Sequence, residues 1–196
     1  MAPLFLALVH YPVLNRVGEI IASAVTNLDL HDLARTGCTF GVPVCYIVTP
    51  LKDQQALSLR LTRHWIDGRG GEILPERREA LKRLEVVESI ASAREDIFRR
   101  TGKYPVLWAS TARQGVRPLS HARARRQLER EDRPFLLLLG TGWGLAPSVF
   151  EETDAVLAPI AGAGSYNHLP VRSAAAIFLD RLLGGGGSND ESGSDL

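Results

Sequence analysis

Cysteine is scarce in this 196-residue chain, which holds only Cys38 and Cys45. The two lie seven residues apart and form no Cys-x-x-Cys pair, which argues against a disulfide framework and a zinc ribbon. No stretch approaches the roughly 18 apolar residues of a membrane-spanning helix, and the apolar run 4–9 is too short for the core of a signal peptide. These absences predict a soluble, cytoplasmic protein without a membrane segment.

Metal-ligand spacing is also lacking, because the histidines stand far apart and form none of the usual ligand patterns. We therefore expect no metal site. The histidines are His10, His31, His64, His121 and His168.

The composition, with 45% hydrophobic and 23% charged residues, is typical of a globular protein. Residues 184–196 contain a single apolar residue and are predicted to form a disordered Gly/Ser/acidic tail. Residues 1–183 are long enough to bury the core of one domain. The tail carries three acids and no base, which leaves 23 bases against 19 acids in residues 1–183. This balance permits a polyanionic partner without requiring one.

Short apolar runs alternate with amphipathic stretches along the chain. The runs are rich in Leu and Val and do not alternate with polar residues, which is typical of strands buried on both faces. The sequence therefore predicts an α/β fold, a mostly parallel sheet with helices on both faces. The expected strands are 4–10, 44–48, 84–88, 106–109, 135–139 and 155–158, and the expected helices are 18–25, 30–36, 54–66, 89–99, 120–131 and 171–183.

Two glycine-rich segments follow the last two expected strands. Residues 140–147 read GTGWGLAP, and residues 159–170 read PIAGAGSYNHLP. Ligands of open α/β sheets bind beyond the carboxyl ends of the strands, where glycine lets the backbone approach them closely. The alternative is that the glycines only make turns, which is a weaker explanation when two consecutive loops carry them.

The common nucleotide-binding signatures are missing from these loops. A Walker-type phosphate loop needs a lysine after its last glycine, and none follows. A dinucleotide fingerprint needs Gly-x-Gly-x-x-Gly, whereas the spacing here is Gly-x-Gly-x-Gly. A Rossmann methyltransferase carries that spacing after its first strand, but only one expected strand follows it here. The ordinary Rossmann interpretations therefore fail on position.

The same segments resemble the SPOUT superfamily of S-adenosylmethionine-dependent RNA methyltransferases. In that superfamily a glycine-containing loop follows the penultimate strand, as residues 139–147 do here. A hydrophobic-glycine segment, a polar turn and a final helix then follow the last strand, as in residues 159–180. The run is similar to that of bacterial tRNA guanine-N1 methyltransferases, and most similar to a small bacterial family of predicted RNA methyltransferases.

A second match lies near the N-terminus. Residues 29–42, DLHDLARTGCTFGV, resemble the first motif of ribose-2′-O SPOUT enzymes, which runs Asn, five residues, Arg-Thr and then Gly-Val before a strand. Arg35 and Thr36 match the Arg-Thr. Asp29 stands where the motif has Asn, which puts ribose chemistry in doubt.

The resemblance implies a C-terminal trefoil knot and a homodimer whose active site is shared between subunits. It also implies S-adenosylmethionine as the cofactor, held by backbone groups of the loops 110–112, 139–144 and 160–169. The implied cofactor-binding residues are Thr111, Ala112, Leu139, Gly140, Thr141, Gly142, Gly144, Ile160, Gly162, Asn167, Leu169 and Ser173.

Methyl transfer needs an acceptor held near the methyl group and help in removing a proton from a ring nitrogen or a ribose hydroxyl. Arg35 is the first candidate for the chemistry, with a solvated helix arginine as the alternative. Asp29 and Asp32 are candidate bases, although a role in capping a helix explains them equally well. Asn15 and Arg16 are candidate substrate-binding residues, or else form a plain turn.

Residues 113–133 carry seven arginines and three acids. Arginine forks suit phosphate recognition, so this stretch is a candidate RNA contact, and a solvated, salt-bridged helix is the alternative.

Together these patterns predict an S-adenosylmethionine-dependent RNA methyltransferase that acts on a tRNA or rRNA nucleoside. A knotted module that binds S-adenosylmethionine or RNA without turnover is the alternative. An ordinary nucleotide-binding α/β protein is disfavoured by the missing lysine. The sequence does not identify the RNA, the nucleoside or the methylated atom.

Overall fold

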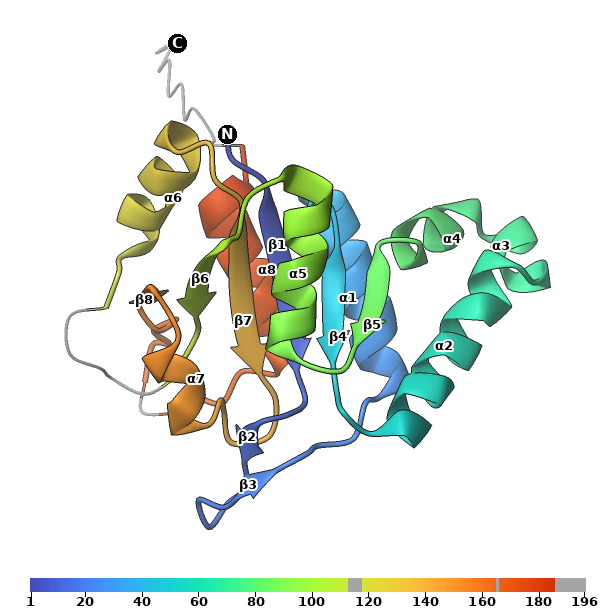
Figure 1. The fold of residues 1–196 in the computed structure, drawn as a ribbon, viewed down its shortest axis with the longest axis horizontal. Coiled ribbons are helices and arrows are strands. Elements are labelled where there is room, and N and C mark those ends of the chain that lie inside the picture. Colours follow the sequence, from blue (N-terminus) through green and yellow to red (C-terminus); the bar gives the residue numbers. More distant parts are fainter. Residues whose placement is uncertain (113–117, 165, 186–196) are drawn as a thin grey trace, which may run out of the picture.

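The computed structural model describes residues 1–112, 118–164 and 166–185, and a sheet of parallel strands runs through its centre (Figure 1). The strands are β1 (Leu4–Val9), β2 (Val13–Leu14), β3 (Ile20–Ile21), β4 (Cys45–Val48), β5 (Leu84–Val87), β6 (Val106–Ala109), β7 (Phe135–Gly140) and β8 (Ala155–Val156). The helices are α1 (Asn27–Thr39), α2 (Lys52–Ile66), α3 (Arg69–Ile73), α4 (Pro75–Leu81), α5 (Ile90–Thr101), α6 (His121–Arg130), α7 (Pro147–Glu151) and α8 (Val171–Leu183).

The central sheet has the strand order β5-β4-β1-β7-β6-β8, and every described pair in it is parallel. β1 lies in the middle, with β4 on one side and β7 on the other. The carboxyl ends of all six strands therefore meet at one edge of the sheet. β2 and β3 form a separate antiparallel hairpin beyond that edge (Figure 1).

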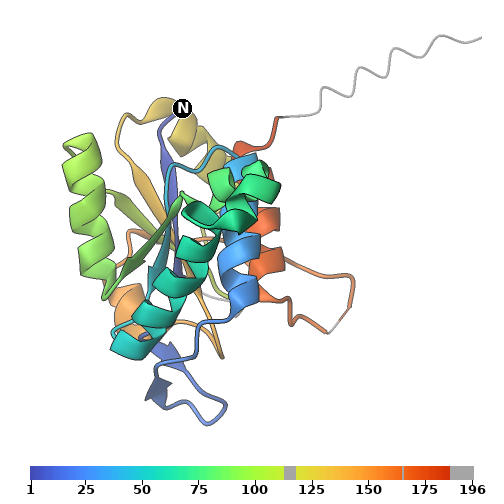
Figure 2. The same ribbon diagram turned by 90° about the vertical axis from the view of Figure 1, so that its right-hand side faces the viewer.

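Helices cover both faces of the sheet, as the sequence predicted. In β1 the side chains of Leu4, Leu6 and Leu8 pack into the core under α1, α4, α6 and α8. The intervening side chains of β1 pack into a second core under α5 and α7. Figure 2 shows α5 on one side of the sheet and α1 and α8 on the other. Burial on both faces explains why the strands read as continuous apolar runs.

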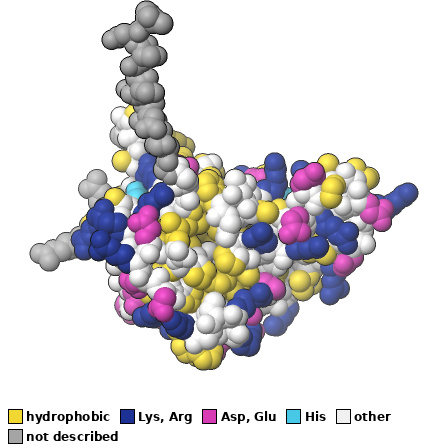
Figure 3. All heavy atoms as spheres, turned by 90° about the horizontal axis from the view of Figure 1, so that it is seen from above, with side chains coloured by type: hydrophobic (Ala, Val, Ile, Leu, Met, Phe, Trp, Pro, Cys, Tyr) yellow, Lys and Arg dark blue, Asp and Glu magenta, His cyan; other side chains and the backbone are white. Residues whose placement is uncertain are grey.

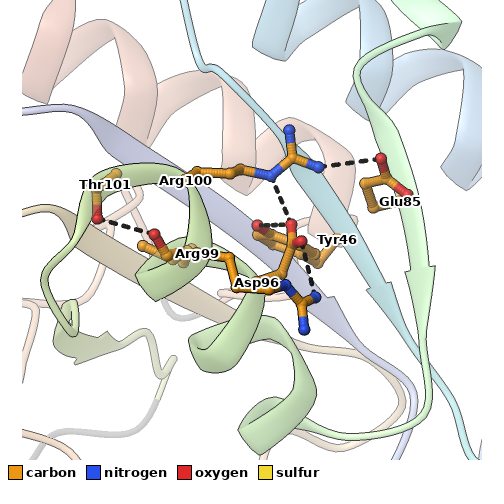
Figure 4. Close-up of polar contacts among 7 residues, drawn as sticks. Tyr46, Glu85, Asp96, Arg99, Arg100 and Thr101 are labelled. Atoms are coloured by element: carbon orange, nitrogen blue, oxygen red, sulfur yellow. Dashed lines mark hydrogen bonds and ion pairs between the residues drawn. The ribbon is translucent and has the colours of Figure 1, made fainter.

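A polar network holds α5 against the sheet (Figure 4). The hydroxyl of the buried Tyr46 donates to Asp96, which also accepts from Arg99 and Arg100, and Arg100 reaches Glu85. Burial opposes ionisation of Asp96, but the hydrogen bonds from Arg100, Arg99 and Tyr46 outweigh it and hold the pKa of that carboxyl below its usual value. Burial, with the bond to Asp96, raises the pKa of Tyr46.

The helix expected at 18–25 is wrong. Residues 18–21 form the end of the turn and the second strand of the β2–β3 hairpin, and residues 22–25 form neither a helix nor a strand. The Asn15 side-chain oxygen accepts from the backbone N–H groups of Val17 and Glu19, and Gly18 takes a φ of +87°, which favours glycine. These hydrogen bonds stabilise a tight turn, and a helix starting at residue 18 would require them to be broken.

The remaining expected elements are confirmed, with ends that differ by up to three residues. The short helices α3, α4 and α7 and the hairpin were not expected. Residues 186–196 of the predicted tail, and residues 113–117 of the arginine-rich stretch, lie outside the described residues. The trefoil knot stays a prediction. Among the described residues, no helix is long and apolar enough to cross a membrane.

Candidate active site

A cavity of about 960 Å³ lies at the carboxyl edge of the sheet. Its walls come from the loop after β6, the glycine loop after β7, the segment before α8, and the stretch from the end of β1 to the start of α1. These segments are far apart in the sequence and meet because parallel strands all end at this edge. The cavity is large enough for a ligand of cofactor size.

The glycine loop after β7 has a fixed shape. Gly142 and Gly144 have φ values of +58° and +101°, a conformation that other residues rarely adopt. The backbone N–H of Trp143 donates to the Leu14 carbonyl at 2.9 Å, and the Leu14 N–H donates to the Gly144 carbonyl at 2.9 Å. The hairpin therefore holds the loop in place from outside.

Most of the cofactor-binding residues predicted from the sequence line this one cavity. Gly162 and Ser173 are the exceptions and do not line it. The residues that do are Thr111, Ala112, Leu139, Gly140, Thr141, Gly142, Gly144, Ile160, Asn167 and Leu169.

Of the predicted catalytic residues, only Asp29 reaches the cavity. Its carboxylate is already engaged, because Oδ2 accepts from the backbone N–H and hydroxyl of Thr26 and Oδ1 accepts from Arg172 at 3.2 Å. The N–H group of Asp29 donates back to the Thr26 hydroxyl, so the two residues form a capping box at the start of α1. The helix-capping alternative for Asp29 is thus what the structure shows.

Asp32 and Arg35 lie further along α1, outside the cavity lining. Asp32 accepts from Arg172 Nε at 3.1 Å, so Arg172 of α8 joins both acids of α1. The side chain of Arg35 is exposed.

Asn15 and Arg16 lie in the turn of the hairpin and do not line the cavity. The Asn15 side chain is occupied by bonds to its own turn and by a 2.8 Å bond to Glu19. Its position is thus explained by the turn, the alternative left open by the sequence.

Several cavity residues were missed by the sequence analysis. His10 is the first residue after β1 and was considered only as a metal ligand. Ser23, Ala24 and Thr26 fall in or next to the segment wrongly expected to be helical. One signal was readable, since a histidine directly at the end of an apolar strand lies where ligands of such sheets bind.

The cavity lining includes a polar cluster, formed by His10, Ser23, Thr26, Asp29 and Thr141. Hydrogen bonds join His10 to Ser23, Ser23 to Thr141, and Thr26 to Asp29. Other lining residues are apolar, among them Leu139, Ile160, Val171, Ala174 and Phe178.

At the rim, three aromatic rings lie close together. The His168 ring contacts Tyr166 and Trp143 edge-on, with centroids 5.2 and 6.5 Å apart. Tyr166 is 79% exposed and Trp143 52% exposed, so faces of both rings remain open to a planar partner.

No group of three potential metal-ligating side chains is found in the part of the chain that the structure describes.

Several solved structures share the fold of this chain. A probable methyltransferase from Bordetella pertussis Tohama I aligns with 92% of this chain and 94% of its own at a TM-score of 0.60 and 17% identity. TrmJ from Z. mobilis aligns with 94% of this chain and 70% of its own at a TM-score of 0.60 and 13% identity. The A. aeolicus TrmH/SpoU tRNA-modifying enzyme aligns with 93% of this chain and 73% of its own, at a TM-score of 0.52 and 13% identity. The fold is that of the TrmH/SpoU, or SPOUT, methyltransferases.

The sequence then gives the family. A family model described as SAM-dependent RNA methyltransferase, SAM being S-adenosylmethionine, matches residues 3–184, and this chain belongs to that family. The family predicted from the resemblance, the α/β fold with its mostly parallel sheet, and S-adenosylmethionine as the cofactor are thereby confirmed.

Curated relatives support the assignment. A tRNA (guanine-N(1)-)-methyltransferase of Nitratidesulfovibrio vulgaris is 48% identical over 181 residues, which are 92% of this chain but 42% of that protein. This chain thus spans about two-fifths of the length of that relative, whose name describes the whole protein. An uncharacterized protein of Aquifex aeolicus is 35% identical over 91% of this chain and 87% of its own length.

Proposed function

We propose that this chain transfers a methyl group from S-adenosylmethionine to an RNA nucleoside, with the cofactor bound in the cavity at the carboxyl edge of the sheet. The observation that carries the proposal is the meeting of three loops, two of them rich in glycine, around that one cavity in a member of this family.

The lining fits the cofactor. A Cβ atom built on Gly142 would come within 2.9 Å of the Leu14 carbonyl oxygen, and one on Gly140 would collide with the backbone of residues 144 and 145. Glycine is thus required at both positions for the loop to fold back on itself and pack against the hairpin, which fixes this wall of the cavity. The apolar lining residues suit the adenine ring, and the polar lining residues suit the charged and hydroxyl groups of the cofactor. When bound, S-adenosylmethionine supplies a methyl group activated on a sulfonium.

RNA as the partner is supported by charge. Arg123, Arg126 and Arg130 are exposed on one face of α6, and they border a shallow hollow of about 220 Å³. Figure 3 shows Lys and Arg side chains gathered over this part of the surface. A stripe of arginine forks suits a phosphate backbone. The open aromatic faces of Trp143 and Tyr166 suit stacking on a base, and tRNA is the first RNA to test.

We further propose that residues 1–183 act as one methyltransferase domain with a C-terminal trefoil knot, in the cytoplasm. The domain would work as a homodimer whose active site is shared between subunits. The position of Arg35 supports this arrangement, because a catalytic arginine that is exposed and outside its own cavity needs a second copy to act upon.

Cofactor binding and transfer test the function directly. We expect S-adenosylmethionine and its demethylated product to bind in calorimetry, and NAD and ATP not to bind. Labelled S-adenosylmethionine should then transfer its methyl group to RNA from a strain that lacks the protein, and mass spectrometry of the nucleosides should identify the product. Binding of ATP without S-adenosylmethionine would contradict the proposal. Cofactor binding without transfer to any RNA would favour a binding module.

Arg35→Ala should keep the fold and the affinity for S-adenosylmethionine but lose methyl transfer. Arg35→Lys should restore little activity, because a point charge does not reproduce a planar guanidinium on a phosphate or base edge. Turnover of RNA and the melting temperature are the two measurements. A lower melting temperature with near-normal turnover per folded molecule would make Arg35 a structural residue.

Mixing two inactive variants tests whether the site is shared. In a dimer of one Arg35→Ala chain and one Gly142→Val chain, one of the two sites would combine an intact arginine with an intact cavity. Random exchange of subunits should therefore recover about one quarter of the wild-type activity. No recovery after confirmed exchange would place Arg35 and the cavity it serves in the same chain, or remove Arg35 from the reaction.

A further inference from the structure

The imidazole of His10 belongs to the polar cluster of the cavity lining and has no solvent-exposed surface. Its Nε2 atom is buried and has no hydrogen-bond partner. Asp29, the other ionisable residue of this cluster, already has partners on both carboxylate oxygens. Among the described side chains that line the cavity, the His10 Nε2 atom is therefore the one buried polar atom still without a partner.

A chain of hydrogen bonds fixes which ring nitrogen of His10 carries the proton. The Thr141 hydroxyl donates to the Val9 carbonyl at 3.0 Å, since a carbonyl can only accept. Having one proton, Thr141 must accept from Ser23. Ser23 in turn must accept from His10 Nδ1 at 2.9 Å. His10 therefore carries its proton on Nδ1, and Nε2 presents a bare lone pair.

The surroundings of His10 keep the ring neutral. Burial lowers the pKa of His10 below its ordinary value, and the Asp29 carboxylate and the Ala24 carbonyl oppose this only in part. Arg172 pairs with Asp29 and with Asp32, so it balances the charge of these carboxylates. A neutral imidazole with a free Nε2 is a base ready to accept a proton, and Asp29 favours the cation that would form.

We propose that His10 is a catalytic residue, whose Nε2 accepts the proton that the acceptor atom of the RNA loses on methylation. This inference rests on the proposed function. The acceptor lone pair forms the new bond to the methyl carbon, and the breaking carbon–sulfur bond leaves its electron pair on sulfur. The acceptor N–H or O–H bond breaks, and its proton moves to Nε2. One positive charge thus passes from the sulfonium to the imidazole.

The chain of hydrogen bonds through Ser23 and Thr141 also connects His10 to the glycine loop after β7. Thr141 belongs to the glycine loop after β7, whereas His10 ends β1, so the Ser23 bridge fixes the imidazole relative to the loop that holds the methyl donor. A base placed in this way needs no movement between cofactor binding and proton transfer.

Two substitutions separate the functions of the two ring nitrogens. The amide of His10→Asn can still donate to Ser23 from the place of Nδ1, but nothing replaces Nε2. The amide of His10→Gln places an oxygen near Nε2 that accepts a hydrogen bond but does not take a proton at neutral pH. Both variants should lose about 10²- to 10⁴-fold in kcat/KM. Binding of the demethylated cofactor should stay within a few-fold, and the melting temperature should show that both fold. His64→Gln, on the exposed side of α2, is the control and should retain full activity.

The pH profile and the ring nitrogens give readouts that a structural role would not change. Wild-type kcat/KM should fall on the acid side, below the ordinary histidine pKa of 6.5, as His10 becomes protonated, and this limb should vanish from both variants. Nitrogen NMR of the wild type with bound demethylated cofactor should show a protonated Nδ1 and a bare Nε2 without any RNA present.

Three results would overturn the role of His10 alone. They are full activity in His10→Gln, a loss of cofactor affinity as large as the loss of kcat/KM, and a protonated Nε2 in neutral His10. Failure of the wild type to bind S-adenosylmethionine at all would instead overturn the proposed function, and the base role with it.

Discussion

Gly142→Val should abolish binding of S-adenosylmethionine while leaving the secondary structure unchanged. Gly142 has a φ of +58°, and its Cβ would lie 2.9 Å from the Leu14 carbonyl oxygen. Strain of this kind costs about 1–3 kcal/mol, which corresponds to roughly 5- to 150-fold in Kd. A β-branched side chain also forces the loop away from the hairpin, so its remaining contacts with the ligand are lost as well. Calorimetry with the demethylated cofactor measures the effect.

Gly164→Ala is the matched control in the second glycine-rich loop. Its φ is not in the left-handed region, and an added Cβ would meet nothing within 4 Å. This variant should bind the cofactor like the wild type. Normal binding by Gly142→Val would mean that the glycine loop is only a turn.

Arg172→Ala should lower the melting temperature by roughly 4–8 °C, for a loss of about 2 kcal/mol in the free energy of unfolding. Arg172 is the cation that α8 offers to Asp29 and Asp32 of α1. The side chain of Asp29 is only 7% exposed, so its carboxylate would stay buried without a counter-ion. The loss is smaller than for a fully buried pair, because Thr26 still donates to Asp29 and Arg172 is partly exposed.

A double variant tests whether the ion pair between Arg172 and Asp29 causes the expected loss of stability. In an Asp29→Asn background, the same Arg172→Ala change should cost much less, because no buried charge is left behind. Arg181→Ala, also on α8, removes an exposed arginine and should change the free energy of unfolding by no more than about 0.5 kcal/mol. Equal losses from Arg172→Ala with and without the Asp29 charge would show that packing of the arginine stem, and not the ion pair, joins the two helices.

The strands of the central sheet could be read from the sequence because their cause is local. Each is an apolar run that fits between two layers of helices, and residues 135–139 need no other part of the chain to be recognised. The segment 18–25 could not be read in this way. Its extended form depends on the Asn15 turn and on the bonds between Leu14 and the glycine loop more than 120 residues away. Such long-range contacts cannot be predicted from the local periodicity of the sequence.

In the candidate site, too, features with a local cause could be predicted from the sequence and features that depend on distant residues could not. The glycine loops were found because glycine spacing after a strand is visible in one dimension. The protonated nitrogen of His10 could not be predicted in this way. It depends on the hydrogen bonds of Ser23 and of Thr141, which lies 118 residues beyond Ser23. The engagement of Asp29 likewise depends on Arg172, 143 residues further along.

The central position of β1 has a consequence for the order in which the protein is made. One edge of β1 pairs with β4, which is synthesised soon after β1. The other edge pairs with β7 (Phe135–Gly140), which is synthesised much later. Until β7 has been synthesised, the central strand of the sheet therefore presents an open edge, which is a template for wrong pairing. The cavity forms later still, because α8 closes it with the last described helix. A nascent chain thus needs protection of its central strand until β7 is made, and it has no complete cavity until α8 is made.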